Sequence, residues 1–343
     1  MKKIILLFGF LFIFSKAYSQ DEYFKDMDIT LSNPDLNGSI YYNNTIFVYG
    51  ESGMVLQSTD KGQTWSQFCI NDSMNIIKMI NLNNELYGIS SNNFLFKSTD
   101  NGKKWIIKSI GRDYNFYGLE VLKDKLYCLG KNKIYSIQND LSLQIEYEFT
   151  TDTSYYEMAV VNSKIYYTSG KGKIGIYDVS NKTNEVIDLS ELGLCQNCKT
   201  TRLLIPTEDK LYFYVRFDLF SLDAKSKEVK KVASAMNPNN AAIGAYKNKL
   251  FNIYTFNDTY QFNLDSLYFY TYDNINDVWE RTDENKYDRY IWDLKFTALN
   301  FIDDNTIIAV GKDKLIYMSY DGGKNWKLKS SLTKYGYEQK IFP

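Results

Sequence analysis

One eight-residue pattern occurs three times in this chain, and it constrains the fold more than any other feature of the sequence. The pattern is Ser-x-Asp-x-Gly-x-x-Trp, and it begins at Ser58, Ser98 and Ser319. With average residue usage a match arises at roughly a few start positions per million, so three matches in one chain indicate a repeat. In a tight turn between strands, the Ser and Asp side chains accept backbone N–H groups, the Gly supplies a positive φ, and the Trp packs beneath the turn. The pattern therefore predicts repeated β-hairpins.

A second element, a short strand opened by a polar turn, recurs even where the first pattern has decayed. Its apolar third residue marks seven positions along the chain: Ile46, Leu86, Leu126, Ile165, Leu211, Leu250 and Ile307. Four short strands about every 40 residues is the period of a propeller blade. Aromatic residues make up 16% of the chain, which also favours strands. The sequence therefore predicts an all-β fold, a seven-bladed β-propeller of four-stranded blades from about Tyr23 to about Leu332.

The last blade is predicted to be complete within its own sequence. Its four strands are expected at Phe296–Phe301, Thr306–Val310, Leu315–Ser319 and Trp326–Lys329. The first and last repeats must still bury each other's faces. An extra strand across their junction could come from Met27–Leu31 or from Tyr335–Phe342, and the sequence leaves both open.

The N-terminus is typical of a secretory signal peptide. Two lysines precede the apolar run Ile4–Phe14, and Ala17 and Ser19 are small residues ahead of a cut before Gln20. A run of about 11 residues is shorter than the roughly 18 to 20 that span a bilayer. We therefore expect residues 1–19 to be removed and residues 20–343 to form a single propeller with a short C-terminal tail. The product is expected to be exported, to the periplasm, the cell surface or the medium, without membrane insertion.

Composition excludes several classes of function. Lys and Arg total 40 and Asp and Glu total 41, a balance that argues against a nucleic-acid-binding surface. The chain has no His, the commonest metal ligand and general base, which excludes zinc hydrolases and Ser-His-Asp enzymes. Carboxylates are plentiful, but none form a pair with diagnostic catalytic spacing. The sequence predicts no nucleic-acid partner, no metal or other cofactor and no catalytic residues.

The four cysteines fall into two groups. Cys195 and Cys198 have a C-x-x-C spacing in a segment that reads as a loop, which favours a small local disulfide or two free thiols over a redox site. Cys69 and Cys128 lie in expected strands and are interpreted as small core residues.

The three boxes resemble the Asp box, also called the bacterial neuraminidase repeat, of β-propeller proteins. We interpret the boxes as turn and packing elements. Nine residues are expected to have this structural role: Asp60, Gly62, Trp65, Asp100, Gly102, Trp105, Asp321, Gly323 and Trp326. Replacing a box Asp is expected to leave buried turn N–H groups unpaired.

Neuraminidase activity itself is not expected. The resemblance to those enzymes implies six blades, an Arg-Ile-Pro segment near the start and three arginines that grip the substrate carboxylate. This chain has five arginines, the first of them Arg112, and no Arg-Ile-Pro segment. Blade number and boxes are more similar to the exported seven-bladed propellers grouped with the photosystem II stability and assembly factor. That resemblance implies an assembly or binding scaffold without chemistry.

Strand order places the boxes on the face opposite to the one on which propellers bind ligands. Three arginines are expected at equivalent entry positions of that ligand face, and aromatic residues accompany them: Arg112, Tyr114, Tyr156, Arg202, Arg289 and Trp292. The simpler interpretation is that each arginine only pairs with a local carboxylate. The hypothesis is a cationic, aromatic-lined mouth that recognises an anionic or aromatic group. The long loop Asn257–Asp265 is expected on the same face.

The predicted function is an exported, non-catalytic scaffold that binds another protein or assists envelope assembly. The alternative is a secreted module that binds a surface glycan on its aromatic-rich face, or a glycoside hydrolase-like propeller.

Overall fold

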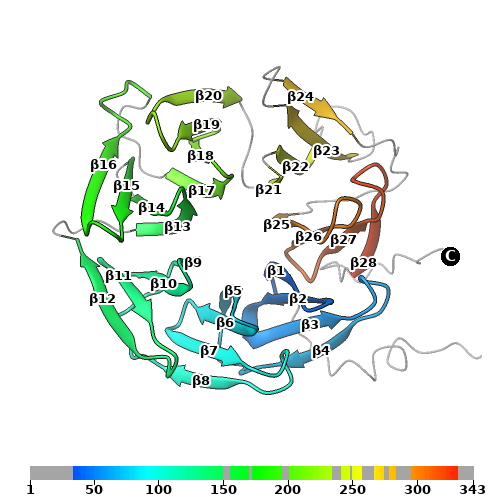
Figure 1. Ribbon diagram of the computed structural model, residues 1–343. Coiled ribbons are helices and arrows are strands. Elements are labelled where there is room, and N and C mark those ends of the chain that lie inside the picture. The colour runs from blue at the N-terminus through cyan, green and yellow to red at the C-terminus, as the bar shows by residue number, and fades with distance from the viewer. Residues whose placement is uncertain are drawn as a thin grey trace, which may run out of the picture. The chain divides into compact units, whose positions relative to one another are not determined.

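Seven antiparallel sheets of four strands follow one another along the chain. The computed structural model describes residues 34–149, 155–169, 172–194, 201–233, 241–247, 249–256, 266–273, 278–282 and 295–330. In each sheet the four strands are consecutive in sequence and neighbours in space (Figure 1). The prediction of an all-β, seven-bladed propeller with four-stranded blades is confirmed.

The strand boundaries follow the predicted repeat. Blades 1 to 3 are β1 (Leu36–Tyr42), β2 (Thr45–Gly50), β3 (Met54–Ser58), β4 (Ser66–Cys69); β5 (Ile76–Leu82), β6 (Glu85–Ser90), β7 (Phe94–Ser98), β8 (Ile106–Ser109); and β9 (Gly118–Leu122), β10 (Lys125–Gly130), β11 (Lys133–Ile137), β12 (Leu143–Glu148). Blades 4 and 5 are β13 (Tyr155–Val161), β14 (Lys164–Ser169), β15 (Lys173–Asp178), β16 (Thr183–Asp188); and β17 (Thr201–Pro206), β18 (Lys210–Val215), β19 (Asp218–Asp223), β20 (Val229–Ala233). Blades 6 and 7 are β21 (Ala241–Tyr246), β22 (Lys249–Phe256), β23 (Ser266–Asp273), β24 (Val278–Arg281); and β25 (Phe296–Phe301), β26 (Ile307–Gly311), β27 (Ile316–Ser319), β28 (Lys327–Ser330).

The seven marker residues lie in the second strands, where they form the core. Each of them is at most 2% exposed. The second strand of blade 1 is buried along its whole length, whereas the outer strand β4 is half-buried or exposed. Middle strands are covered on both sides by neighbouring blades, and the outer strands meet solvent.

The core consists of clusters shared by consecutive blades. In one cluster Tyr166 of blade 4 packs with Phe213 of blade 5, and in another Phe269 of blade 6 packs with Trp326 of blade 7. Further clusters join blades 1 and 2, 2 and 3, 3 and 4, and 5 and 6. Each repeat thus buries its faces only against its neighbours, which is how repeat architectures gain stability.

Side-chain contacts join the first and last blades. Both blades are built from consecutive strands, and blade 7 has the four strands predicted for it. Asn300 Nδ2 donates to Ser39 Oγ over 2.8 Å, and Lys312 pairs with Asp35 over 3.2 Å. The two segments considered for an extra strand across this junction, Met27–Leu31 and Tyr335–Phe342, lie outside the described residues.

Candidate functional site

The turns of the propeller fall on two faces. Because adjacent strands in a blade are antiparallel, the inner-to-second turns share a face with the third-to-outer turns, which carry the boxes. We call this the box face. The second-to-third turns and the outer-to-inner connections form the other, the connection face, where Glu51–Gly53 and residues 110–117 lie.

In each box the buried hydrogen bond is made by the serine. Ser58, Ser98 and Ser319 are at most 2% exposed. Their Oγ atoms accept the buried N–H of the box glycine over 2.7, 2.9 and 2.8 Å, respectively. Each hydroxyl donates in turn to the box aspartate, over 2.8 or 2.9 Å.

The box aspartates bind the outside of the turn. Asp60 accepts the N–H groups of Gln63 and Thr64, both of which are exposed. Donation from the hydroxyl and N–H of Thr64 lowers the pKa of Asp60 to about 2. The expectation that the aspartates satisfy buried N–H groups was wrong, because the serine accepts the buried one.

We therefore expect Ser319→Ala to destabilise the protein more than Asp321→Ala. Loss of the serine oxygen leaves the buried Gly323 N–H without an acceptor, which costs about 1–3 kcal/mol. Chemical denaturation of the two variants measures the difference. A larger loss for Asp321→Ala would contradict this assignment of roles.

The box glycines also let each box touch the preceding blade. All three have positive φ, and a Cβ on any of them would collide with a buried side chain of that blade: Gly62 with Met318, Gly102 with Phe47 and Gly323 with Phe269. The tryptophans pack beneath the turns as predicted, but to different depths. Trp326 is 4% exposed, whereas Trp65 and Trp105 are only half-buried. The boxes are structural elements, and each one joins two blades.

Among the predicted ligand-face residues, Arg112 and Tyr114 are placed on the connection face between blades 2 and 3. Arg112 is exposed, and no carboxylate of the described residues pairs with it, Asp113 included. Tyr114 is half-buried, with its ring centroid 5.5 Å from that of Tyr135 and 6.2 Å from that of Phe116. The Arg112 side chain is therefore free to bind a ligand, whereas the Tyr114 ring is fixed by packing.

The remaining candidates are less fully placed. Tyr156 lies inside β13 and Arg202 inside β17, so both belong to the start of an inner strand rather than to the connection before it. Arg289, Trp292 and the loop Asn257–Asp265 lie outside the described residues. Whether these residues meet at one mouth stays a prediction.

Five inner strands carry a β-bulge at their connection-face end, a feature that the sequence did not reveal. The register shifts in β1, β5, β13, β17 and β25. Bulges leave backbone groups unpaired. At three junctions a side chain at the bulge of one blade bonds the backbone of the next: Asn37 Nδ2 donates to Ile76 O over 2.8 Å, Leu204 N donates to Glu157 Oε2 over 2.7 Å, and Thr297 Oγ1 donates to Leu36 O. The connection face is therefore cross-linked at the junctions of blades 1 and 2, 4 and 5, and 7 and 1.

An ion pair adds a further link between inner strands. Lys78 of β5 lies 2.6 Å from Glu120 of β9. Although burial by itself would lower the pKa of Lys78, the Glu120 carboxylate raises it above the ordinary value. Lys78 therefore stays charged and holds blades 2 and 3 together near the same rim.

The two cysteines of the described strands differ in exposure. Cys128 is buried in β10 as predicted, whereas Cys69 at the end of β4 is exposed, so its assignment to the core was wrong because outer strands face solvent. Cys195 and Cys198 lie outside the described residues.

Within the described part of the chain, no group of three or more His, Cys, Asp or Glu side chains is arranged to hold a metal ion. In the same part, none of the helical segments has the length and hydropathy of a membrane span.

Sequence comparison gives one partial match. A family model described as the DUF6242 beta propeller domain matches residues 8–114, which include all the strands of blades 1 and 2. Among curated proteins, none matches this sequence.

Solved structures share the fold at low identity. Virginiamycin B lyase from Staphylococcus aureus superposes with a TM-score of 0.64 at 12% identity, over 84% of this chain and 95% of that one. YCF48 bound to D1 peptide gives 0.58 at 13% identity, over 87% and 90%. The extracellular domain of the putative one component system BT4673 from B. thetaiotaomicron gives 0.58 at 14% identity, over 83% of this chain and 38% of that one. At these identities, the comparisons show a shared fold alone.

Proposed function

We propose that this protein is an exported, non-catalytic propeller that binds a segment of another protein on its connection face and so acts as a binding or envelope-assembly scaffold. The observation that carries the proposal is the exposed and unpaired side chain of Arg112. Its guanidinium is exposed and has no carboxylate partner among the described residues, so its hydrogen-bonding capacity is available to a ligand. A guanidinium binds a carboxylate in two parallel hydrogen bonds, which gives specificity as well as affinity.

The surroundings of Arg112 support a preorganised site. Tyr114, two residues away, is held between Phe116 and Tyr135, so it offers a fixed aromatic surface beside the charge. The Lys78–Glu120 ion pair joins blades 2 and 3 near Arg112, and bulge side chains join blades 1 and 2 and blades 4 and 5 on the same face. A rigid rim loses little conformational entropy when a partner binds.

The comparisons supply analogies for this role. YCF48, which shares the fold over most of its length, has been solved bound to D1 peptide, and the resemblance to photosystem II assembly propellers points to the same kind of partner. The fold also supports chemistry, since virginiamycin B lyase shares it. That enzyme is inactive when a histidine is replaced by alanine, and the present chain has no histidine.

A variant comparison tests the proposal. Short random peptides displayed on phage are selected on the mature protein, and the enriched peptides are synthesised. We expect acidic or aromatic residues in them. Arg112→Ala should weaken binding about tenfold or more, the cost of losing hydrogen bonds to a charged group. Adding Arg202→Ala and Arg289→Ala tests whether the other two predicted arginines contribute.

The matched control removes the same charge from the box face. Lys103, Lys104 and Lys123 lie on box-face turns and are exposed. Their triple change to alanine should leave the affinity for the selected peptides unchanged. Equal affinities for the triple-arginine variant, the triple-lysine variant and the wild-type protein would show that the connection face is not the site.

A further inference from the structure

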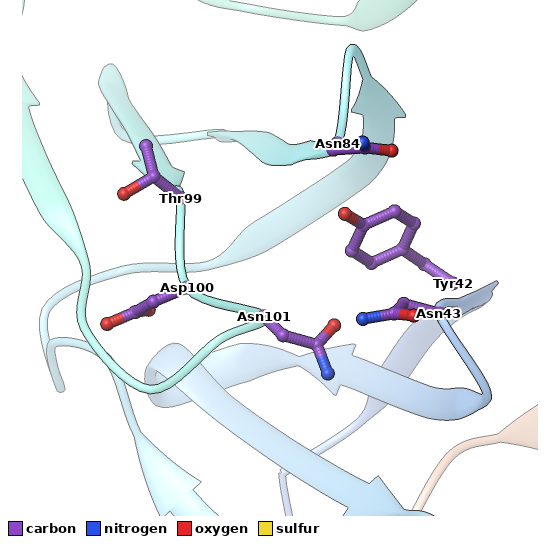
Figure 2. Close-up of a pocket in the computed structure, with 6 residues that line it drawn as sticks. All are labelled: Tyr42, Asn43, Asn84, Thr99, Asp100 and Asn101. Atoms are coloured by element: carbon purple, nitrogen blue, oxygen red, sulfur yellow. The ribbon is translucent and has the colours of Figure 1, made fainter.

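A polar depression of about 520 Å³ lies on the box face, between blades 1 and 2. Its lining comes from two inner-to-second turns, which contribute Tyr42, Asn43 and Asn84, and from the box of blade 2, which contributes Thr99, Asp100 and Asn101. Figure 2 shows the amides of Asn43 and Asn101 directed toward each other, with the Tyr42 ring between them and Asn84. The volume is within the range of about 300–1,000 Å³ for small-molecule sites.

The equivalent junction between blades 7 and 1 is bridged by an ion pair. There Lys61, the residue after the box aspartate, reaches Asp303 of the neighbouring turn over 2.9 Å. In blade 2 that position is Asn101, whose shorter side chain reaches only Thr45 Oγ1, over 3.3 Å. Replacing a spanning lysine with an asparagine leaves the space between the two turns open.

The turns that line the depression tolerate asparagine without requiring it. Asn43 and Asn84 have φ of 47° and 62°, and asparagine tolerates this left-handed conformation. The corresponding turns of blades 3 and 4 hold Lys123, Asp124 and Ser163 with φ of 50°, 56° and 58°. Other side chains are therefore accepted at these positions, although asparagine also occurs in the turn of blade 4, as Asn162 with a φ of 46°.

The polar groups of the depression are left with unused hydrogen-bonding capacity. Asn101 Oδ1 has no donor in the structure but is covered from solvent, so the accessible amides of the depression are those of Asn43 and Asn84. Asn84 and Asn43 are exposed, and their side chains have no partner among the described residues. Carboxamides and a phenol both donate and accept, as sugar hydroxyl groups do. The half-buried Tyr42 ring adds an apolar surface of the kind that packs against a sugar ring.

The charges of the lining residues indicate which class of ligand the depression can bind. The six lining residues include one carboxylate and no Lys or Arg. A divalent cation prefers several carboxylate or carbonyl oxygens, and a phosphate group prefers cationic donors. We propose that this depression binds a neutral oligosaccharide. The site is independent of the protein-binding function proposed above, since it lies on the opposite face.

The test uses the mature protein on an array of neutral and acidic oligosaccharides, followed by calorimetric titration of the best neutral one. Asn101→Lys copies Lys61, whose φ of 57° is close to the 59° of Asn101, so it should fold normally and fill the depression. We expect it to weaken binding more than tenfold. Asn84→Ser and Tyr42→Phe, which each remove one group, should weaken binding about threefold to tenfold, the effect of one hydrogen bond.

Two controls fix the location of the site. Asn162→Ser changes an exposed asparagine at the equivalent turn of blade 4, where φ is 46°, and should leave the affinity unchanged. Arg112→Ala on the connection face should also leave it unchanged, even if it abolishes peptide binding. The proposal is overturned if neutral oligosaccharides fail to bind, if only acidic ones bind, or if Asn101→Lys binds as the wild-type protein does.

Discussion

Replacing Trp326 by alanine is expected to cost the propeller about 3–5 kcal/mol of unfolding free energy, the usual range for a buried tryptophan. The side chain is 4% exposed, and its Nε1 donates to Gly323 O over 2.9 Å. Its ring centroid lies 5.1 Å from that of Phe269 in blade 6. Truncation would therefore open a cavity in the core shared by blades 6 and 7. Chemical denaturation at equilibrium measures the loss.

Trp65→Ala is the matched comparison, because Trp65 has the same place in the box of blade 1 but is only half-buried. Less apolar surface is lost there, so the destabilisation should be clearly smaller. Equal losses for the two variants would mean that the tryptophans act through the turn itself and not through the core between blades.

Gly323→Ala is expected to be similarly damaging, at about 2–5 kcal/mol. The residue has a φ of 95°, and alanine in a left-handed conformation costs about 1–2 kcal/mol. The added Cβ would also lie 2.1 Å from Cε1 of Phe269, a fully buried ring of blade 6, and such overpacking costs about 1–3 kcal/mol more.

The neighbouring glycine separates the two contributions. Gly322 also has a positive φ, 74°, but a Cβ there would have only Asp304 O nearby, at 3.5 Å. The corresponding residues of the other boxes are Lys61 and Asn101, so a side chain is tolerated. Gly322→Ala should cost about 1–2 kcal/mol, the backbone effect alone. If both variants lose the same stability, contact with the preceding blade is not what requires Gly323.

The repeat made the architecture predictable, because blade period and strand order are local properties of the sequence. The marker Leu211 identifies the second strand of blade 5 even though its box has decayed, and it is fully buried. The motif did not reveal which of its polar residues is buried. Ser98 and Asp100 are both polar and two residues apart, and only the packing of blade 2 against blade 1 shows that the serine faces inward.

Features that depend on pairing between distant residues were not predictable. The bulge at Asn37 exists because of the register between β1 and β2, and its side chain bonds Ile76, 39 residues away. The depression on the box face depends on the length of Asn101 in comparison with Lys61, a contrast visible only once each box is seen against the preceding blade. The sequence pointed to Arg112, but its lack of a local partner is a fact of the structure.

Hydrogen–deuterium exchange with a phage-selected peptide tests most directly the claim that partners bind on the connection face. We expect slower exchange on peptide addition at residues 110–117 and at Glu51–Gly53, on the connection face, with no change in the boxes at 58–65, 98–105 and 319–326. Protection confined to the boxes, with unchanged exchange at 110–117, would contradict it.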